Sequence, residues 1–336
     1  MELQKHNRLL LVFIHGFKGS EKTFQGFPEC LKETLGNSST AIDVDVVIYP
    51  RYETRGDLTV AATNLCNWLI NIGEEQVARG LSPPLVVLVG HSMGGLLAAD
   101  AYFNLRETSI GASEGNRQWL PRIIGILAFD TPYYGVESNL FAETARSRAT
   151  DLQSKYSSSI SLMSTLASAA RTATTNTSTT NRAVGQDNKA GSKLKWGVLG
   201  AVVAATAAAG ATAYWQREKL QNGMEYVTSH LEFVKSLTKQ DQLRERYSCL
   251  EEMSNEMIFH CFYMRVRNNN TPRTFIVPPP KETAGFFTSI QSTASDEVDA
   301  HTTIFNPNVN AQYSRLCNAS IQLITMMLWK NNQVFR

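Results

Sequence analysis

The amino-acid sequence predicts an α/β fold with a mostly parallel central sheet and helices on both of its faces. Short apolar runs of strand length alternate with helical patterns over residues 1–135, an order that is typical of doubly wound sheets. The runs mostly lack polar alternation, so we expect both faces of each strand to be covered. A glycine-rich turn leads directly from one of these runs into a helix.

The individual elements follow in chain order. Four strands are expected at 9–14 (LLLVFI), 44–49 (VDVVIY), 85–89 (LVVLV) and 123–129 (IIGILAF). Helices are expected between them at 27–35, 60–72 and 93–105. Strand-like sequence resumes at 258–266 (IFHCFYMRV) and again at 274–277, and a closing helix is predicted over 311–330. This order predicts one sheet that is completed by the C-terminal part of the chain.

Residues 136–250 interrupt the pattern and are predicted to form an insert between two parts of one core, 1–135 and 251–336. The insert begins with a segment rich in Ser, Thr, Ala and Asn, a composition that predicts flexibility. It continues with an apolar stretch over 196–215 that carries no charge. An amphipathic helix is predicted to follow, over 226–237.

Net charge and cysteine count indicate which binding partners and which cellular compartment to expect. A net charge of +2 and a pI near 8.2 are too mild to indicate nucleic acid as a partner. The five cysteines are odd in number and widely scattered, which predicts free thiols in a reducing compartment. The apolar run at 9–14 is too short for a signal-peptide core. We therefore expect an intracellular protein, cytoplasmic or peripheral on an organelle membrane, and not a secreted one.

The strongest chemical motif is Gly90-His91-Ser92-Met93-Gly94-Gly95, between a predicted strand and a predicted helix. In this context a G-x-S-x-G motif presents a nucleophilic serine on a tight, strained turn. Gly90 and Gly94 leave room for that turn, and Gly95 allows the helix to pack closely on the strand. The motif predicts Ser92 as a nucleophile at the N-terminus of a helix.

A serine nucleophile needs donors for the oxyanion that it creates. In this type of turn one donor is the backbone N–H of the residue after the serine, here Met93. The second is expected from the loop after the first strand, which reads His15-Gly16-Phe17. We expect the N–H of Phe17 to point at the same place, and His15 to brace the loop.

The general base is expected after the serine in the chain, with the acid between them or close by. His301 lies in Asp296-Glu297-Val298-Asp299-Ala300-His301, which is interpreted as a loop before the closing helix, so it is the candidate base. His260 falls inside a predicted strand and is interpreted as a satisfied histidine of the sheet.

The acid is less certain from sequence, because the loop after 258–266 reads Arg-Asn-Asn-Asn and holds no carboxylate. Asp130, at the end of the preceding strand, is the first candidate, since neighbouring strand ends lie only about 5 Å apart. Asp299 is the main alternative and Asp296 a weaker one. A weak or missing acid also stays open.

These motifs together resemble the lipase and serine esterase branch of the α/β-hydrolase fold. The resemblance rests on Phe13-Ile14-His15-Gly16-Phe17, the Ser92 turn, Phe129-Asp130-Thr131-Pro132-Tyr133-Tyr134-Gly135 and the His301 segment. Tyr133 stands where many lipases have histidine. Pancreatic-type lipases take their acid from the same strand end, which favours Asp130. The resemblance covers residues 9–135 and about 258–330 and does not cover the insert, which is expected between the sixth and seventh strands of the fold.

The apolar stretch 196–215 would span about 30 Å as a helix, the thickness of a bilayer core. Eight of its twenty residues are alanine and three are glycine, so insertion would be marginal. A single crossing would also place Ser92 and His301 on opposite sides of a membrane. Three roles stay open: a lid helix, a helix in peripheral contact with a membrane, or an oligomer contact.

The predicted activity is hydrolysis of carboxylic esters by a Ser-His-Asp acyl-enzyme mechanism, with lipid-like acyl esters as substrates. A lipase, phospholipase or carboxylesterase would fit. No cofactor and no metal is expected. The alternatives are a thioesterase or amidase with the same triad, and a membrane-associated scaffold with a degenerate hydrolase fold.

Overall fold

A seven-stranded sheet forms the centre of the computed structural model, which describes residues 8–17, 19–37, 42–50, 52, 58–112, 120–137, 240–268 and 271–333. All of these residues belong to one unit of the structure, comprising 1–140 and 232–336. The apolar stretch 196–215, the segment at 154–190 and the helix predicted over 226–237 lie outside the described residues. None of the described helices is long and apolar enough to cross a membrane.

The strands run in the spatial order β2-β1-β3-β4-β5, and β6 and β7 both pair with β5. All neighbours are parallel except β5 and β6, which form an antiparallel pair. The strands are β1 (Arg8–Ile14), β2 (Asp43–Ile48), β3 (Leu85–His91), β4 (Arg122–Phe129), β5 (Ile258–Asn268), β6 (Thr271–Thr274) and β7 (Phe287–Ser292). Because the strands are parallel, the ends of β3, β4 and β5 meet at one edge of the sheet.

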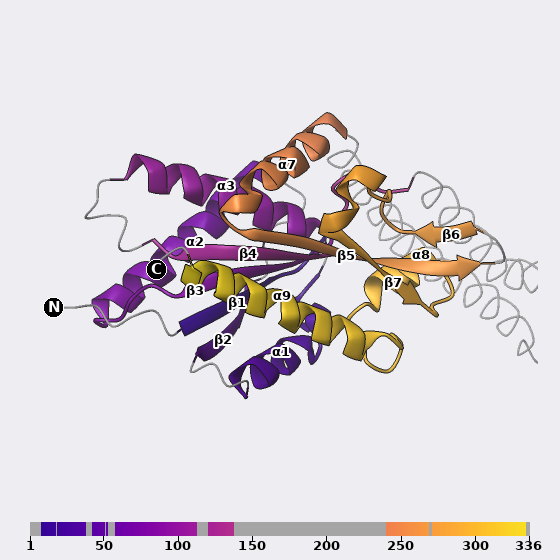
Figure 1. The fold of residues 1–336 in the computed structure, drawn as a ribbon, viewed down its shortest axis with the longest axis horizontal. Coiled ribbons are helices and arrows are strands. Elements are labelled where there is room, and N and C mark those ends of the chain that lie inside the picture. The colour runs from indigo at the N-terminus through magenta and orange to yellow at the C-terminus, as the bar shows by residue number, and fades with distance from the viewer. Residues whose placement is uncertain are drawn as a thin grey trace, which may run out of the picture. The chain divides into compact units, whose positions relative to one another are not determined.

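Helices cover both faces of the sheet (Figure 1). On one face α2 (Leu58–Ala78), α3 (Met93–Gly111) and α7 (Gln240–Glu252) pack in one apolar cluster with side chains of β1, β3 and β4. On the other face α1 (Phe27–Gly36) and α9 (Tyr313–Gln333) pack in a second cluster. The short helix α8 (Glu297–Thr302) contributes to the same cluster. Short 3-10 turns η1 (Glu21–Phe24), η2 (Met253–Asn255) and η3 (Lys281–Phe286) complete the described elements.

The predicted fold class is confirmed, and the strands expected before residue 130 lie within two residues of their predicted ends. The insert falls between β4 and β5 in chain order. Helix α7 begins at Gln240, inside the range predicted for the insert, and it packs Leu243 and Leu250 into the same cluster as α2 and α3.

Two local predictions near the C-terminal part of the chain were wrong. The strand expected at 274–277 ends at Thr274, and only an isolated bridge follows, from Ile276 to Val136. His301 does not lie in a loop but in the last turn of α8. The helix escaped prediction because it is only six residues long, too short for a helical repeat of apolar residues.

The prediction of free thiols is wrong for two of the five cysteines. Cys30 of α1 and Cys317 of α9 form a disulfide across 287 residues of sequence. The pairing follows from the fold, since α1 and α9 lie side by side on the same face of the sheet (Figure 1). The other three cysteines, Cys66, Cys249 and Cys261, are free.

Candidate active site

The nucleophile turn follows β3 and leads directly into α3. Ser92 has φ 55° and ψ −127°, a strained backbone conformation for a residue with a side chain. A Cβ on Gly94 would collide with the backbone carbonyl of Ile14, and one on Gly90 would collide with Gly95. The glycines of the motif are therefore required by close backbone contacts around the serine.

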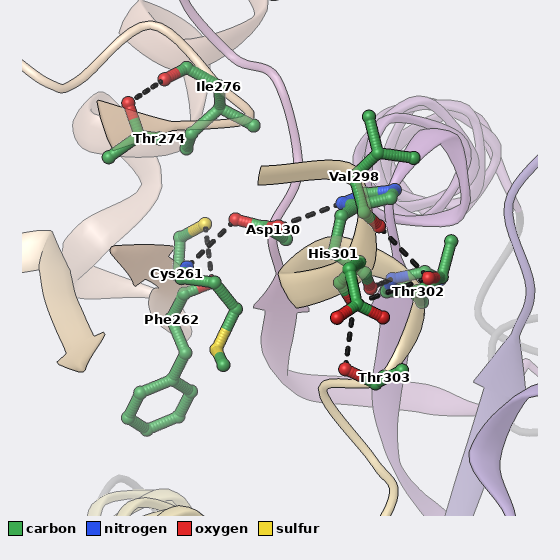
Figure 2. Close-up of polar contacts among 12 residues, drawn as sticks. Asp130, Cys261, Phe262, Thr274, Ile276, Val298, His301, Thr302 and Thr303 are labelled. Carbon is green, nitrogen blue, oxygen red and sulfur yellow. Dashed lines mark hydrogen bonds and ion pairs between the residues drawn. The ribbon is translucent and has the colours of Figure 1, made fainter. Parts of the chain in front are cut away.

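Asp130 follows β4, the neighbouring strand, and also has a positive φ, 51°. Its side chain is completely buried. One carboxylate oxygen, Oδ1, accepts a hydrogen bond of 2.9 Å from the backbone N–H of Met264 in β5. The other, Oδ2, lies 2.8 Å from Nδ1 of His301 (Figure 2). Both oxygens of the carboxylate are thus engaged, and the side chain is fixed in one orientation.

The imidazole of His301 is held by this carboxylate in the orientation that a general base requires. Because an ionised carboxylate only accepts, Nδ1 carries the proton and Nε2 is left as the acceptor in the neutral ring. The ring also stacks on Phe275, with centroids 3.7 Å apart and planes inclined by 14°. His301 is 7% exposed and Ser92 is 4% exposed, so charges that develop here are poorly screened by water.

The other candidate acids make different contacts. Asp296 is the N-cap of α8, and its side chain accepts a hydrogen bond of 2.7 Å from the backbone N–H of Asp299. The carboxylate of Asp299 accepts from the backbone N–H and the hydroxyl of Ser295. These contacts stabilise the beginning of the helix. The structure therefore brings Asp130, rather than Asp299 or Asp296, to the imidazole of His301.

The loop after β1 lies against the serine. A Cβ placed on Gly16 would come within 2.7 Å of Cβ and 3.2 Å of Oγ of Ser92, so this loop passes directly over the nucleophile. His15 braces the loop: its ring stacks on Tyr52, whose hydroxyl donates a hydrogen bond of 2.7 Å to the His15 carbonyl. The predicted oxyanion donors, Phe17 and Met93, stand at the end of this loop and at the first residue of α3.

Sequence reasoning missed three residues that contact this site. Nε2 of His91 lies 3.1 Å from the backbone carbonyl oxygen of His301. The Tyr133 hydroxyl donates a hydrogen bond of 2.9 Å to the carbonyl of Gly95, and burial raises the pKa of this phenol well above its ordinary value. Phe275, the third, follows β6 in a segment that pairs with Val136. The unusual tyrosine in the Thr-Pro-Tyr segment was the one available signal.

His260 is the histidine of the sheet that the sequence predicted. It lies on β5 and its Nε2 is 2.9 Å from the hydroxyl of Thr288 on β7. Burial lowers the pKa of His260 to about 4. Among the described residues no group of three His, Cys, Asp or Glu side chains could hold a metal ion.

Fold and site together define the class of protein: a mostly parallel sheet carries a strained serine turn after one strand and a buried acid after the next. This arrangement is that of the α/β-hydrolase fold. Residues 4–169 match the sequence model of a family described as "Putative serine esterase (DUF676)". The match agrees with the resemblance to serine esterases that the sequence motifs indicate. None of the curated proteins matches the sequence significantly.

Several solved structures of hydrolases are similar to parts of the chain. The thioesterase RedJ from Streptomyces coelicolor is 18% identical over 42% of this chain and 49% of its own, with a TM-score of 0.26. Phospholipase PlaB from Legionella pneumophila is 11% identical over 38% of this chain and 26% of its own, with a TM-score of 0.29. The peroxisomal hydrolase Lpx1 from Saccharomyces cerevisiae is 16% identical over 41% of this chain and 39% of its own, also with a TM-score of 0.29. In each case the chain spans less than half of the neighbour.

Proposed function

We propose that Ser92, His301 and Asp130 form a catalytic triad that hydrolyses carboxylic esters with lipid-like acyl chains. The observation that carries the proposal is the hydrogen bond of 2.8 Å between Asp130 Oδ2 and His301 Nδ1. It joins the residue after β4 to α8, 171 positions later in the chain, at the sheet edge where the strained turn presents Ser92. Structural packing alone does not require a buried histidine and a buried carboxylate at this place.

The reaction would proceed in two steps. In the first, Nε2 of His301 takes the hydroxyl proton while Oγ of Ser92 attacks the ester carbonyl, and the imidazolium then protonates the leaving alcohol. In the second, His301 takes a proton from water, which attacks the acyl carbonyl; the bond to Oγ of Ser92 breaks, the acid is released, and the imidazolium returns the proton to Oγ. Asp130 keeps the proton on Nδ1 and stabilises the imidazolium, and the N–H groups of Met93 and Phe17 would hold the oxyanion.

Labelling with a fluorophosphonate probe tests the triad. Wild type should be labelled, and Ser92→Ala should abolish labelling because Oγ is the atom that the probe modifies. His301→Ala should slow labelling by orders of magnitude, since the base is lost. Asp299→Asn is the matched control: it changes a carboxylate in the same helix as His301 and should be labelled like wild type. Equal labelling of wild type and Ser92→Ala would refute the proposed nucleophile.

The preference for lipid-like esters rests on the resemblance to lipases and on the uncharged stretch 196–215. Hydrolysis rates should be compared for a short soluble ester, a long-chain phospholipid in vesicles and a thioester of the same acyl chain. Higher rates on the vesicle substrate would support the lipid preference and the peripheral membrane contact. Activity confined to short soluble esters would refute the preference for lipid-like esters. A preference for the thioester would favour the thioesterase alternative.

A scaffold without catalysis is the second candidate, because the loop after β5 lacks the usual carboxylate. The contact between Asp130 and His301 supports the enzyme instead. An intracellular, membrane-peripheral location is proposed with the enzyme, and fractionation of cells that express the tagged chain would test it.

A further inference from the structure

His91 immediately precedes the nucleophile, yet the mechanism gives it no task. It is the last residue of β3, and its side chain is 6% exposed. Its Nε2 lies 3.1 Å from the backbone carbonyl oxygen of His301. A carbonyl oxygen can only accept, so Nε2 of His91 carries a proton and donates it in this hydrogen bond.

The acceptor is a carbonyl that the helix itself leaves without a partner. His301 lies in the last turn of α8, where the final four carbonyl groups have no intrahelical N–H to accept from. Helix α8 is only six residues long, so contacts from outside decide where it lies. The hydrogen bond from His91 supplies such a contact at the residue that carries the base.

The rings of the two histidines are also in contact. Their centroids lie 4.7 Å apart, and the centroids of the His91 and Phe305 rings lie 5.5 Å apart in an edge-to-face arrangement. Burial, followed by the proximity of His301, lowers the pKa of His91 well below its ordinary value. A neutral His91 can donate to the carbonyl without placing a second positive charge beside the imidazolium that forms on His301.

We propose that His91 is a positioning residue that ties helix α8 to the nucleophile strand and so fixes the imidazole of His301 relative to Ser92. Asp130 holds the ring at Nδ1, and His91 holds the backbone of the same residue. Because His91 and Ser92 are consecutive, a movement of the His301 backbone is transmitted through this hydrogen bond to Ser92. The inference rests on the proposed triad and adds the element that sets its geometry.

Two substitutions separate this role from simple packing. His91→Phe keeps an aromatic ring in the buried space and removes the donor. His91→Gln removes the ring but carries an amide N–H at about the reach of the imidazole Nε2. We expect His91→Phe to lower kcat on a soluble ester about 100-fold with little change in KM, since a misplacement of about 1 Å costs that much. His91→Gln should recover most of the loss.

Thermal unfolding should be recorded for both variants, so that a loss of fold is recognised. If ring packing were the role, His91→Gln would be the more damaged variant, and that result would overturn the proposal. A wild-type kcat in His91→Phe would overturn it as well.

A readout without turnover keeps this test separate from the triad itself. In proton NMR of the 15N-labelled protein, the Nδ1–H resonance of His301 should persist in wild type and His91→Gln and broaden or vanish in His91→Phe. An unperturbed resonance in His91→Phe would refute the proposal that His91 positions His301. If wild type were not labelled by fluorophosphonate, the proposed function would fail, but this comparison would still decide whether His91 positions His301.

Discussion

The turn after β3 and the turn after β4 lie side by side at one edge of the sheet, and each has a non-glycine residue with positive φ. Ser92 has φ 55° and Asp130 has φ 51°. Each donates its N–H to the neighbouring strand, Ser92 to the carbonyl of Phe129 at 2.9 Å and Asp130 to that of Phe262 at 2.6 Å. Both turns thus direct one functional side chain out of the sheet edge.

The two turns differ in what surrounds them. Helix α3 begins immediately after Ser92 and crowds the turn against the end of β1, so glycines are required at positions 90 and 94. Asp130 is followed by Thr131-Pro132 without a helix, and no glycine occurs before Gly135. The glycines of the serine motif therefore reflect crowding by neighbouring backbone, because a similar positive φ at Asp130 occurs without them.

The largest expected effect tests the turn after β4, the acid turn, which carries Asp130. Asp130→Asn keeps the shape of the side chain but presents an amide to Nδ1 of His301, which favours the imidazole tautomer with the proton on Nε2. That tautomer cannot accept the serine proton, so we expect kcat to fall by about 10³–10⁴-fold. Steady-state kinetics on a soluble ester measure the loss. A fall of less than tenfold would mean that another group serves as the acid.

The next prediction tests crowding at the nucleophile turn. A Cβ in Gly94→Ala would collide with the carbonyl of Ile14, a backbone atom that cannot move cheaply. We expect a loss of about 1–3 kcal/mol in the free energy of unfolding, typical of overpacking, and slower fluorophosphonate labelling.

Gly111→Ala is the matched control, at the other end of the same helix. A Cβ on Gly111 would meet nothing within 4 Å, so the variant should keep its labelling and its stability. Equal stability of the two variants would show that crowding does not explain the glycines.

A smaller effect is expected where the two turns touch. Tyr133, from the acid turn, donates its hydroxyl proton to the carbonyl of Gly95 in the nucleophile turn. Tyr133→Phe removes a buried hydrogen bond, for which we expect a loss of about 1 kcal/mol in urea denaturation. Tyr134→Phe loses a longer bond of 3.3 Å to Thr283 at a half-buried site, and should change stability less. The reverse order would show that this link between the turns contributes little.

Most of the sheet could be predicted from the sequence, because continuous apolar runs mark strands covered on both faces. Strands β1, β3 and β4 have this character. Strand β7 (FTSIQS) was missed because buried and exposed residues mix along it and only two of its residues are strongly apolar. Helix α8 was missed because its six residues are shorter than two helical turns.

The site was predictable to different degrees for the same reasons. The Ser92 turn is local, and crowding requires a glycine pattern that can be read within six residues. The contact between Asp130 and His301 joins residues 171 positions apart, so the sequence could offer Asp130 only as the first of several candidates. The disulfide between Cys30 and Cys317 depends wholly on the packing of two helices, and no local pattern indicates it.

The one predicted gain in stability concerns Thr131, beside both turns. Its side chain is fully buried against Gly95, and its hydroxyl has no hydrogen-bond partner among the described residues. Replacing this hydroxyl by a methyl group in Thr131→Val removes an unsatisfied polar atom without a change of shape. We therefore expect the free energy of unfolding to rise by about 1 kcal/mol.

Thr274→Val is the opposite case and the matched control for Thr131→Val. Its hydroxyl is also buried, but it donates a hydrogen bond of 2.7 Å to the carbonyl of Ile276. The same substitution should therefore lower stability by about 1 kcal/mol in the same urea titration. Opposite signs for the two variants would show that the space between the acid turn and α3 is apolar in character. A loss of stability in Thr131→Val would show instead that its hydroxyl makes a contact that stabilises the junction of the two turns.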